Sequence, residues 1–280
     1  MSLCYDLHAH STFSDGTLSP EDLVARAQEK GVNVLALTDH DTVAGVARAQ
    51  AAAKEQGIEL IPGVEISVSW RNTTIHIVGL NVDPFNERLL AGLDSLRQLR
   101  ELRAQRIAHK LEKQGFENAL ADTIALAGCE AVTRTHFARL IIARGRESDM
   151  ESVFKKWLGR KGKAYVAGEW ASLPDALDWI QQAGGQAVIA HPARYDMTNT
   201  KLGELIADFK QHGGVAMEVA SSSHNVAEKA RMAGCARRHD LLASVGSDFH
   251  SPGNPRIELG AYLQLPEGTE PVWRDWSLSH

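Results

Sequence analysis

Histidine and acidic side chains recur along this chain at spacings that suit metal coordination. His8 and His10 form a His-x-His pair, and Asp15 follows five residues later. Side chains on a strand alternate between its two faces, so both imidazoles would point the same way and could bind one ion. Further clusters stand where other strands are expected to end. The candidate metal ligands are His8, His10, Asp15, His40, Glu65, His76, His191, Asp248 and His250.

This ligand set contains imidazole and carboxylate groups and no thiolate. Such a set suits Mn, Zn or Fe in a catalytic site better than zinc in a closed structural site. Nine ligands are too many for one ion and suit three. Neighbouring ions about 4 Å apart can activate a bridging water and hold both oxygens of an in-line displacement. The sequence therefore predicts a centre of three divalent ions, with Mn as first choice and Zn or Fe as alternatives.

The elements that must position these residues alternate between strands and helices. Ser19 and Pro20 are typical of a helix start, and Gly31 and Gly57 of helix ends. Apolar strands that alternate with helices indicate a mainly parallel sheet covered by helices. Strands are expected at 3–7, 32–37, 59–66, 75–80, 187–190, 215–219 and 241–245, and helices at 20–31, 43–56, 174–183 and 202–212.

Reactive residues at the carboxyl ends of about seven β/α units favour an α/β fold of the TIM-like barrel type. An open, doubly wound sheet is the weaker alternative, because it also binds ligands at carboxyl strand ends. Neither a Gly-x-Gly-x-x-Gly sequence nor a P-loop supports a nucleotide-binding fold. An amide hydrolase on a similar barrel would usually use a lysine ligand late in the barrel, and no lysine stands at such a strand end.

The alternation is interrupted by a long helical stretch that is rich in basic residues. Leucines with heptad-like spacing run from Leu89 to Leu102, and further helices are expected near 122–127 and 135–143. We expect residues 85–162 to form an inserted helical cap subdomain. Residues 1–84 and 163–280 would then form the metal-binding barrel.

Composition limits the class of protein and of partner. The chain has 280 residues, 44% of them hydrophobic, and a formal net charge of −5. This charge argues against binding along a long nucleic acid but leaves a small phosphorylated substrate or a polymer end open. No apolar run approaches the ~20 residues of a membrane span, and the N-terminus does not resemble a signal peptide. We expect a cytoplasmic protein with three reduced cysteines (Cys4, Cys129 and Cys235), no membrane association and no obligate protein partner.

A second set of residues could bind a phosphorylated substrate. Phosphate groups are bound by arginine side chains and by helix N-termini. The candidate substrate contacts are Arg134, His136, Arg194, Ser221, Ser222 and His224. His224 is also a candidate general acid, and the serines could instead cap the next helix. Asp39 and Asp41 flank His40, where one of them could orient an imidazole or both could be solvated.

The order of these motifs resembles a known family. His-x-His, Asp-Gly, Thr-Asp-His, Gly-x-Glu, a lone histidine, His-Pro and Ser-Asp-x-His occur in the order found in the polymerase-and-histidinol-phosphatase (PHP) superfamily. Within it the chain is most similar to the stand-alone, TrpH-like phosphoesterases of bacteria, over nearly its whole length. The resemblance implies a distorted (β/α)7 barrel with three metal ions. It assigns His8, His10, Glu65 and Asp248 to one ion, Asp15, His40 and His250 to a second, and His76 and His191 to a third, with Glu65 bridging.

The resemblance also implies a reaction. Similar proteins act on small phosphorylated nucleotides, so we expect removal of the 3′-phosphate from nucleoside 3′,5′-bisphosphates to give the 5′-monophosphate and phosphate. One alternative is a 5′–3′ exoribonuclease acting on short, 5′-phosphorylated RNA ends. A histidinol phosphatase is a second hypothesis, and a non-catalytic metal-binding module is a third.

Overall fold

The strands form one curved sheet. The computed structural model describes residues 3–128, 132–254 and 256–277. The strands run in the order β1-β2-β3-β4-β6-β7-β8, and the short β5 pairs with β3 outside this path. Their bounds are β1 Tyr5–Asp6, β2 Val34–Leu37, β3 Glu59–Trp70, β4 Thr73–Leu80, β5 Ala171–Ser172, β6 Gln186–Ile189, β7 Ala216–Ser221 and β8 Leu242–Gly246.

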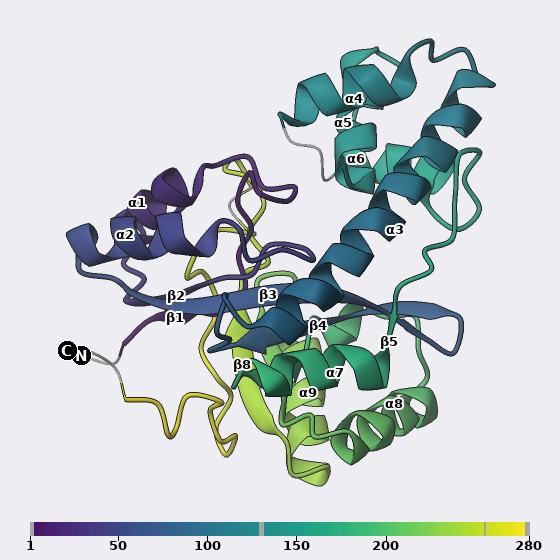
Figure 1. The fold of residues 1–280 in the computed structure, drawn as a ribbon. Helices are drawn as coiled ribbons and strands as arrows, with labels where there is room; N and C mark the ends of the chain where they lie inside the picture. Colours follow the sequence, from purple (N-terminus) through teal and green to yellow (C-terminus); the bar gives the residue numbers. More distant parts are fainter. Residues whose placement is uncertain (1–2, 129–131, 255, 278–280) are drawn as a thin grey trace.

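The two ends of this sheet meet and nearly close a barrel. The Leu7 N–H donates to the Val245 carbonyl at 3.1 Å, and the Asp248 N–H donates to the His8 carbonyl at 2.8 Å. These bonds bring the first and last strands together (Figure 1). The TIM-like α/β barrel expected from the sequence is therefore confirmed.

β4 is the main distortion of the barrel. It runs antiparallel to both β3 and β6, whereas the other pairs are parallel. β3 and β4 form a hairpin whose turn residues Arg71 and Asn72 have φ of 43° and 61°. A two-residue turn leaves no room for a helix between these strands. The expectation of a mainly parallel sheet is correct except at this strand.

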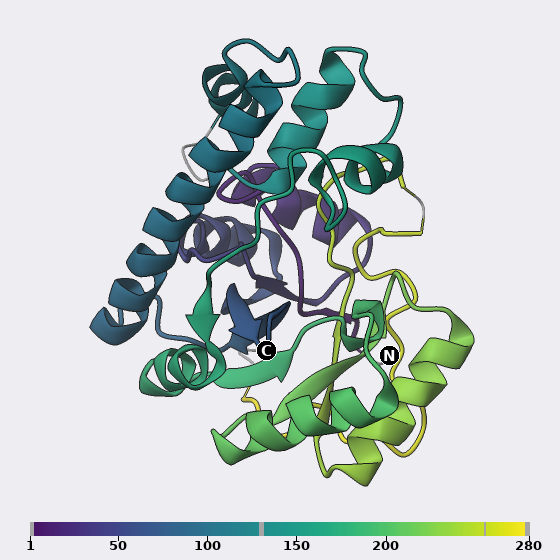
Figure 2. The ribbon, with the colours of Figure 1, turned by 90° about the vertical axis from the view of Figure 1, so that its right-hand side faces the viewer.

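Helices cover the outside of the barrel, with α1 and α2 on one side and α7 to α9 on the other (Figures 1 and 2). The Asp22 N–H donates to Ser19 Oγ at 3.1 Å, which caps α1 at the predicted start. Gly57, with φ of 67°, ends α2 as predicted. The bounds are α1 Pro20–Glu29, α2 Val46–Gln56, α7 Leu173–Gln182, α8 Asn199–Gln211 and α9 Val226–Arg238.

The helical stretch expected after β4 is present, and its first helix connects it to the barrel. The first half of α3 packs Leu89 and Leu96 into the barrel core, and Gly92 allows close contact with Trp179 of α7. Its second half packs Ile107 into a separate apolar cluster of the cap. Figure 1 shows α3 running from the sheet to the other cap helices. The cap elements are α3 Glu87–Glu112, α4 Ala119–Ala127, α5 Arg134–Ala143, α6 Met150–Val153 and the π-helical turn Phe154–Leu158.

This packing makes α3 part of both units, and the subdomain boundaries at 84/85 and 162/163 stay a prediction. Cys4 and Cys235 are free thiols, whereas Cys129 lies outside the described residues. No helix within residues 3–128, 132–254 and 256–277 has the length and apolarity of a membrane span.

Candidate metal centre

The candidate ligands meet at one end of the barrel, although some are more than 200 residues apart. Three overlapping groups have ligand atoms that all lie within 4.8 Å of one another. These groups are His10, Asp15, His40 and His250; His8, His10, Glu65 and Asp248; and His40, Glu65 and His76. His10 and His40 therefore each belong to two of these groups. The family resemblance, in contrast, assigns each of them to a single ion.

Glu65, in the middle of β3, lies at the centre of the cluster and is fully buried. Its Oε2 atom is 2.8 Å from His40 Nδ1 and 3.3 Å from His8 Nε2. Its Oε1 atom is 2.9 Å from His76 Nδ1 and 3.0 Å from His191 Nε2. One carboxylate thus faces rings from four segments of the chain, which is the geometry of a bridging ligand.

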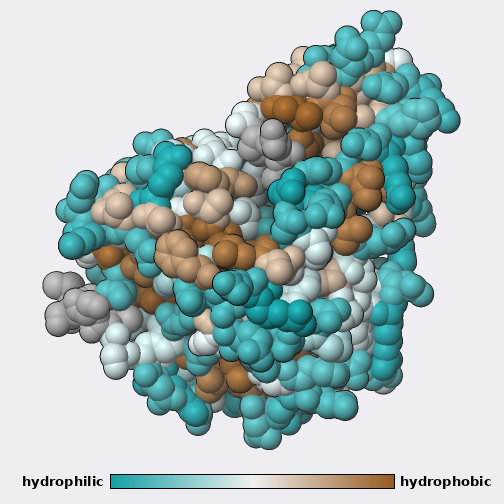
Figure 3. All heavy atoms as spheres, viewed as in Figure 1, coloured by the Kyte–Doolittle hydropathy of each residue, from teal (hydrophilic) through white to brown (hydrophobic). Residues whose placement is uncertain are grey.

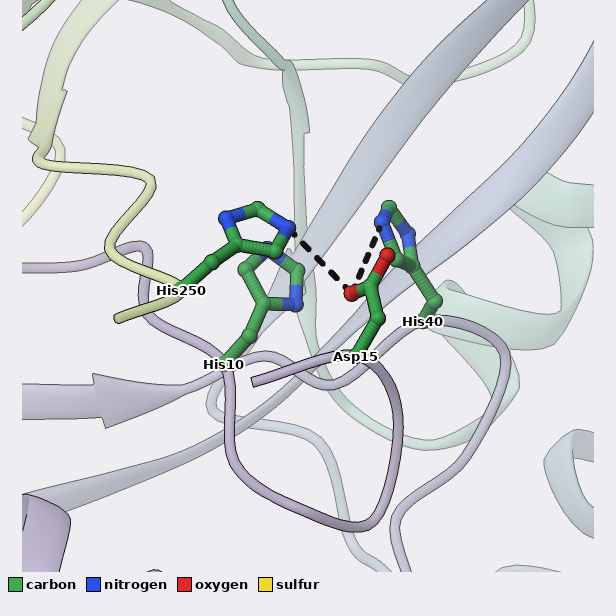
Figure 4. Close-up of side chains that lie close together, drawn as sticks. All are labelled: His10, Asp15, His40 and His250. Atoms are coloured by element: carbon green, nitrogen blue, oxygen red, sulfur yellow. Dashed lines mark ion pairs between the residues drawn. The ribbon is translucent and has the colours of Figure 1, made fainter. Parts of the chain in front are cut away.

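Asp15 is a second carboxylate of the cluster and lies between His40 and His250 (Figure 4). Its Oδ1 atom is 3.2 Å from His250 Nε2 and 3.7 Å from His40 Nε2. The His10 ring stacks beside the His250 ring, with centroids 4.2 Å apart. Asp15, His10, His40 and His250 therefore surround one small volume.

Most of the buried side-chain atoms without a hydrogen-bond partner in the described residues belong to this cluster. A buried polar atom without a partner is costly, so such atoms in a native fold call for a ligand. They are donor atoms of the kinds that divalent transition metals prefer. The atoms of the cluster without a hydrogen bond are His8 Nε2, Asp15 Oδ1, His40 Nδ1, Glu65 Oε2 and His191 Nδ1. Where two of them are close, as His40 Nδ1 and Glu65 Oε2 are, they are not aligned for a hydrogen bond. The residues present fit the metal ions that the sequence implies.

In the metal-free protein the cluster shares protons between carboxylates and imidazoles. Despite burial, Glu65 raises the pKa values of His8 and His40, and Asp15 raises that of His250 to about 9, so these rings must release protons when they bind metal. Burial alone would raise the pKa of Glu65, but the facing His40 and His76 hold it well below its usual range. His250 does the same for the pKa of Asp15. Burial, together with His250, lowers the pKa of His10 to about 3. The carboxylates are therefore ionised, and the His10 ring is neutral.

Glu218, which the sequence analysis missed, orients two candidate ligands. Its Oε1 atom is 2.6 Å from the His8 ring atom Nδ1, and its Oε2 atom accepts a hydrogen bond from the backbone N–H of His191 at 2.5 Å. A carboxylate on the outer ring nitrogen fixes the ring and leaves the other nitrogen for metal. The sequence signal that could have identified Glu218 is its position as an acidic residue inside the apolar strand β7. Gly246 allows this packing, because a Cβ there would lie 2.2 Å from His8 Cβ.

Asp39 and Asp41 are both buried rather than solvated. Asp39 accepts hydrogen bonds from the Ser11 and Ser14 hydroxyls, each at 2.6 Å, beside His10. Asp41 Oδ2 accepts a 2.6 Å hydrogen bond from Arg100 Nε of α3. The Asp41–Arg100 ion pair fixes the cap helix to the loop that carries His40.

Arg194, Ser221 and Ser222 lie on one side of the cluster. Arg194 forms an ion pair with Asp248, and its Nε donates to Ser223 Oγ at 3.0 Å. Ser221 is buried beside Ser223, and Ser222 donates to a backbone carbonyl. None of these serines caps α9, because Asn225 does so. The alternative interpretation of the serines as helix caps is therefore wrong.

His224 lies next to these serines and is also buried. Its Nδ1 is 3.4 Å from the Val219 carbonyl, and its Nε2 has no hydrogen-bond partner among the described residues. Burial lowers its pKa, so the ring is neutral with a free acceptor nitrogen. It would have to take up a proton before it could act as a general acid.

Arg134 and His136 lie at the start of α5, close to Asp15. His136 Nδ1 accepts the Thr133 N–H at 3.1 Å in a capping box, so this atom is occupied inside the cap. The Thr133 hydroxyl donates to Asp15 Oδ2 at 3.0 Å, which places the start of α5 over the metal cluster. Arg134 points to a cavity beside the cluster. Substrate contact by either residue stays a prediction.

Comparison with known proteins identifies the family. The model of the PHP domain family matches residues 6–185, so the chain belongs to that family. This confirms the resemblance seen in the motifs and, with it, the prediction of a phosphoric ester hydrolase.

Two relatives and one solved structure show how far the similarity extends. A 5′-3′ exoribonuclease of Haemophilus influenzae is 50% identical, covering 98% of this chain and 99% of its own. A 3′,5′-nucleoside bisphosphate phosphatase of Chromobacterium violaceum is 46% identical, covering 96% and 95%. A solved structure described as an amidohydrolase from Chromobacterium violaceum, with bound sulfate and no metal, has a TM-score of 0.92. It is 46% identical and covers 97% of this chain and 95% of that one.

Proposed function

We propose that the protein hydrolyses the 3′-phosphate of nucleoside 3′,5′-bisphosphates, releasing the 5′-monophosphate and phosphate. The observation that carries the proposal is the convergence of imidazole side chains from four segments of the chain on the Glu65 carboxylate, beneath a cap with basic side chains. The name of the Chromobacterium relative supports this choice of substrate.

The proposal includes three divalent ions, with Mn as first choice and Zn or Fe as alternatives. His8, His10, Glu65 and Asp248 would hold the first, Asp15, His40 and His250 the second, and His76 and His191 the third, with Glu65 bridging. Such ions supply a coordinated water of lowered pKa and positive charge opposite the phosphate oxygens.

The chain's own residues have separate roles in this reaction. Arg194, beside Asp248, can turn its guanidinium to a phosphate oxygen and offset charge that develops there. Ser221 lies at the same side and would donate a hydroxyl hydrogen bond, whereas Ser222 would first have to release its bond to the Ala261 carbonyl. His224 would transfer a proton at Nε2, once protonated, to the oxygen that leaves phosphorus.

The direct test is replacement of a ligand. Asp248→Ala and His8→Ala should each lower bound metal, measured by elemental analysis, and phosphatase activity together. Arg274→Ala, an exposed change at the surface, serves as the control. Full activity in either ligand variant would refute the site.

A 5′–3′ exoribonuclease acting on 5′-phosphorylated ends is the second candidate, favoured by the Haemophilus relative. A 5′-phosphorylated oligoribonucleotide, analysed on a gel, separates the two activities. Stepwise shortening at an efficiency equal to bisphosphate hydrolysis would make RNA the main substrate. Histidinol phosphate in the same panel tests the third candidate. Lack of turnover of every substrate by metal-loaded protein would favour a metal-binding module.

A further inference from the structure

The cap rises from the barrel, as the outer face in Figure 3 shows. A small cavity is lined by residues of the cap helices and of the metal centre. Its volume is about 70 Å³, which is the room of roughly five waters. Its lining includes three candidate metal ligands together with Arg100 and Arg103 of α3 and Arg134 of α5. The candidate ligands in the lining are Asp15, His40 and His76. The cavity is of a size for one small anion beside the metal ions.

The three arginines differ in how their charge is balanced. Arg100 is buried and forms an ion pair with Asp41. Arg103 donates Nε and Nη2 to one neutral acceptor, the Val166 carbonyl, at 3.1 and 3.0 Å. Arg134 forms no ion pair or hydrogen bond within the described parts of the chain. Its guanidinium lies 5.7 Å from the centre of the Phe154 ring. Neither Arg103 nor Arg134 forms an ion pair among the described residues, although Asp15 lines the same cavity and attracts Arg134.

Two arginines without ion pairs share this cavity with one carboxylate, Asp15, so a further anion would stabilise them. Burial lowers the pKa of Arg103 to about 9, and the charges of Arg134 and Arg100 add to the effect. Burial also lowers the pKa of Arg134. Trp170, whose ring centre is 5.1 Å from the Arg103 guanidinium, helps to hold that group in place. An anion between the two guanidiniums would remove their repulsion and accept planar, paired hydrogen bonds.

We propose that Arg103 and Arg134 bind the phosphate of the substrate that is not hydrolysed. The cavity shares His40 and His76 with the metal centre, so a phosphate in it and a phosphate at the metals lie close enough to belong to one nucleotide. This inference rests on the proposed function: with the 3′-phosphate at the metals, the 5′-phosphate occupies the cavity.

The same subsite accounts for both kinds of relative. A nucleoside 3′,5′-bisphosphate and an RNA with a 5′-phosphate present the same two groups. Each has a terminal 5′-phosphate and, on the 3′ oxygen of the same ribose, a second phosphate to be cut. The subsite would bind the terminal 5′-phosphate of either molecule. The two substrates differ only in what is attached to the 3′-phosphate, which is nothing in the bisphosphate and the rest of the chain in the RNA.

The test compares kcat/KM of Mn-loaded protein for a nucleoside 3′,5′-bisphosphate and for a nucleoside 3′-monophosphate. In Arg103→Met and Arg134→Met we expect the preference for the bisphosphate to fall at least about 30-fold, the usual effect of removing one partner of a buried charge pair. The preference of Arg103→Lys should lie between those of the wild type and Arg103→Met, because lysine keeps the charge and loses the planar donor pair. Arg88→Met, on the same helix but paired with Asp178 at the surface, should keep the preference. An unchanged preference in the Arg103 and Arg134 variants would overturn the assignment.

A binding measurement separates this inference from the proposed function. Calorimetric titration of the metal-free protein with a nucleoside 5′-monophosphate should show tighter binding than titration with the nucleoside. Arg103→Met and Arg134→Met should remove that difference, whereas Arg88→Met should keep it. Equal binding by wild type and the two variants, with unchanged melting temperatures, rejects the subsite. A protein that shows the binding difference but hydrolyses neither nucleotide refutes the proposed reaction and keeps the subsite.

Discussion

Protonation of His136 should make the metal-free protein less stable below pH 7. The ring is 1% exposed, and burial, with Arg139 adding to it, lowers its pKa to about 4. The unfolded chain should titrate near 6.5. Between these values the unfolded state binds a proton that the folded state does not, so stability falls as pH falls.

The size of the effect follows from these two values. Each pKa unit corresponds to about 1.4 kcal/mol, and between pH 7 and pH 5 the difference in proton binding amounts to about 2 kcal/mol of unfolding free energy. His136→Gln provides a matched comparison. Glutamine at this position can still accept the Thr133 N–H in a capping box but does not titrate.

The assay is denaturant unfolding of both proteins, free of metal, at pH 7 and pH 5. The wild type should lose about 2 kcal/mol more than His136→Gln over this interval. Parallel losses in the two proteins would refute the argument. The same variant also tests substrate contact: a purely capping role leaves KM for the bisphosphate unchanged, whereas a contact raises it.

Three other changes test the packing around the cluster. Glu218→Gln should weaken metal binding about 10- to 100-fold, measured by competition with a chelator, because it loses the charge that orients His8. Gly246→Ala should lower metal content at pH 7, since the new methyl group would displace His8, and equal metal content in the variant would contradict this. Arg100→Met should cost about 3–5 kcal/mol of unfolding free energy because Asp41 is left buried and unpaired. The double change with Asp41→Asn should recover part of that loss, and additive losses would show that the pair is not coupled.

Many features of the fold could be predicted from short segments of the sequence. Ser19 caps α1 and Gly57 ends α2 where their residue types predict, because caps depend on neighbours within one turn. The barrel followed from apolar strands between helices. The reversed direction of β4 did not, because strand direction depends on pairing with β3 and β6 across the sheet.

By itself, the sequence determined the chemical identity of the candidate ligands and their placement near the ends of strands. Closure of the barrel decided which of them share a small volume, since His10 and Asp248 meet only when the first and last strands do. The roles of Glu218, Arg100 and Arg103 also depended on tertiary structure. Burial in the company of particular partners gives those charges their effect, and neither burial nor partners can be read from spacing along the chain.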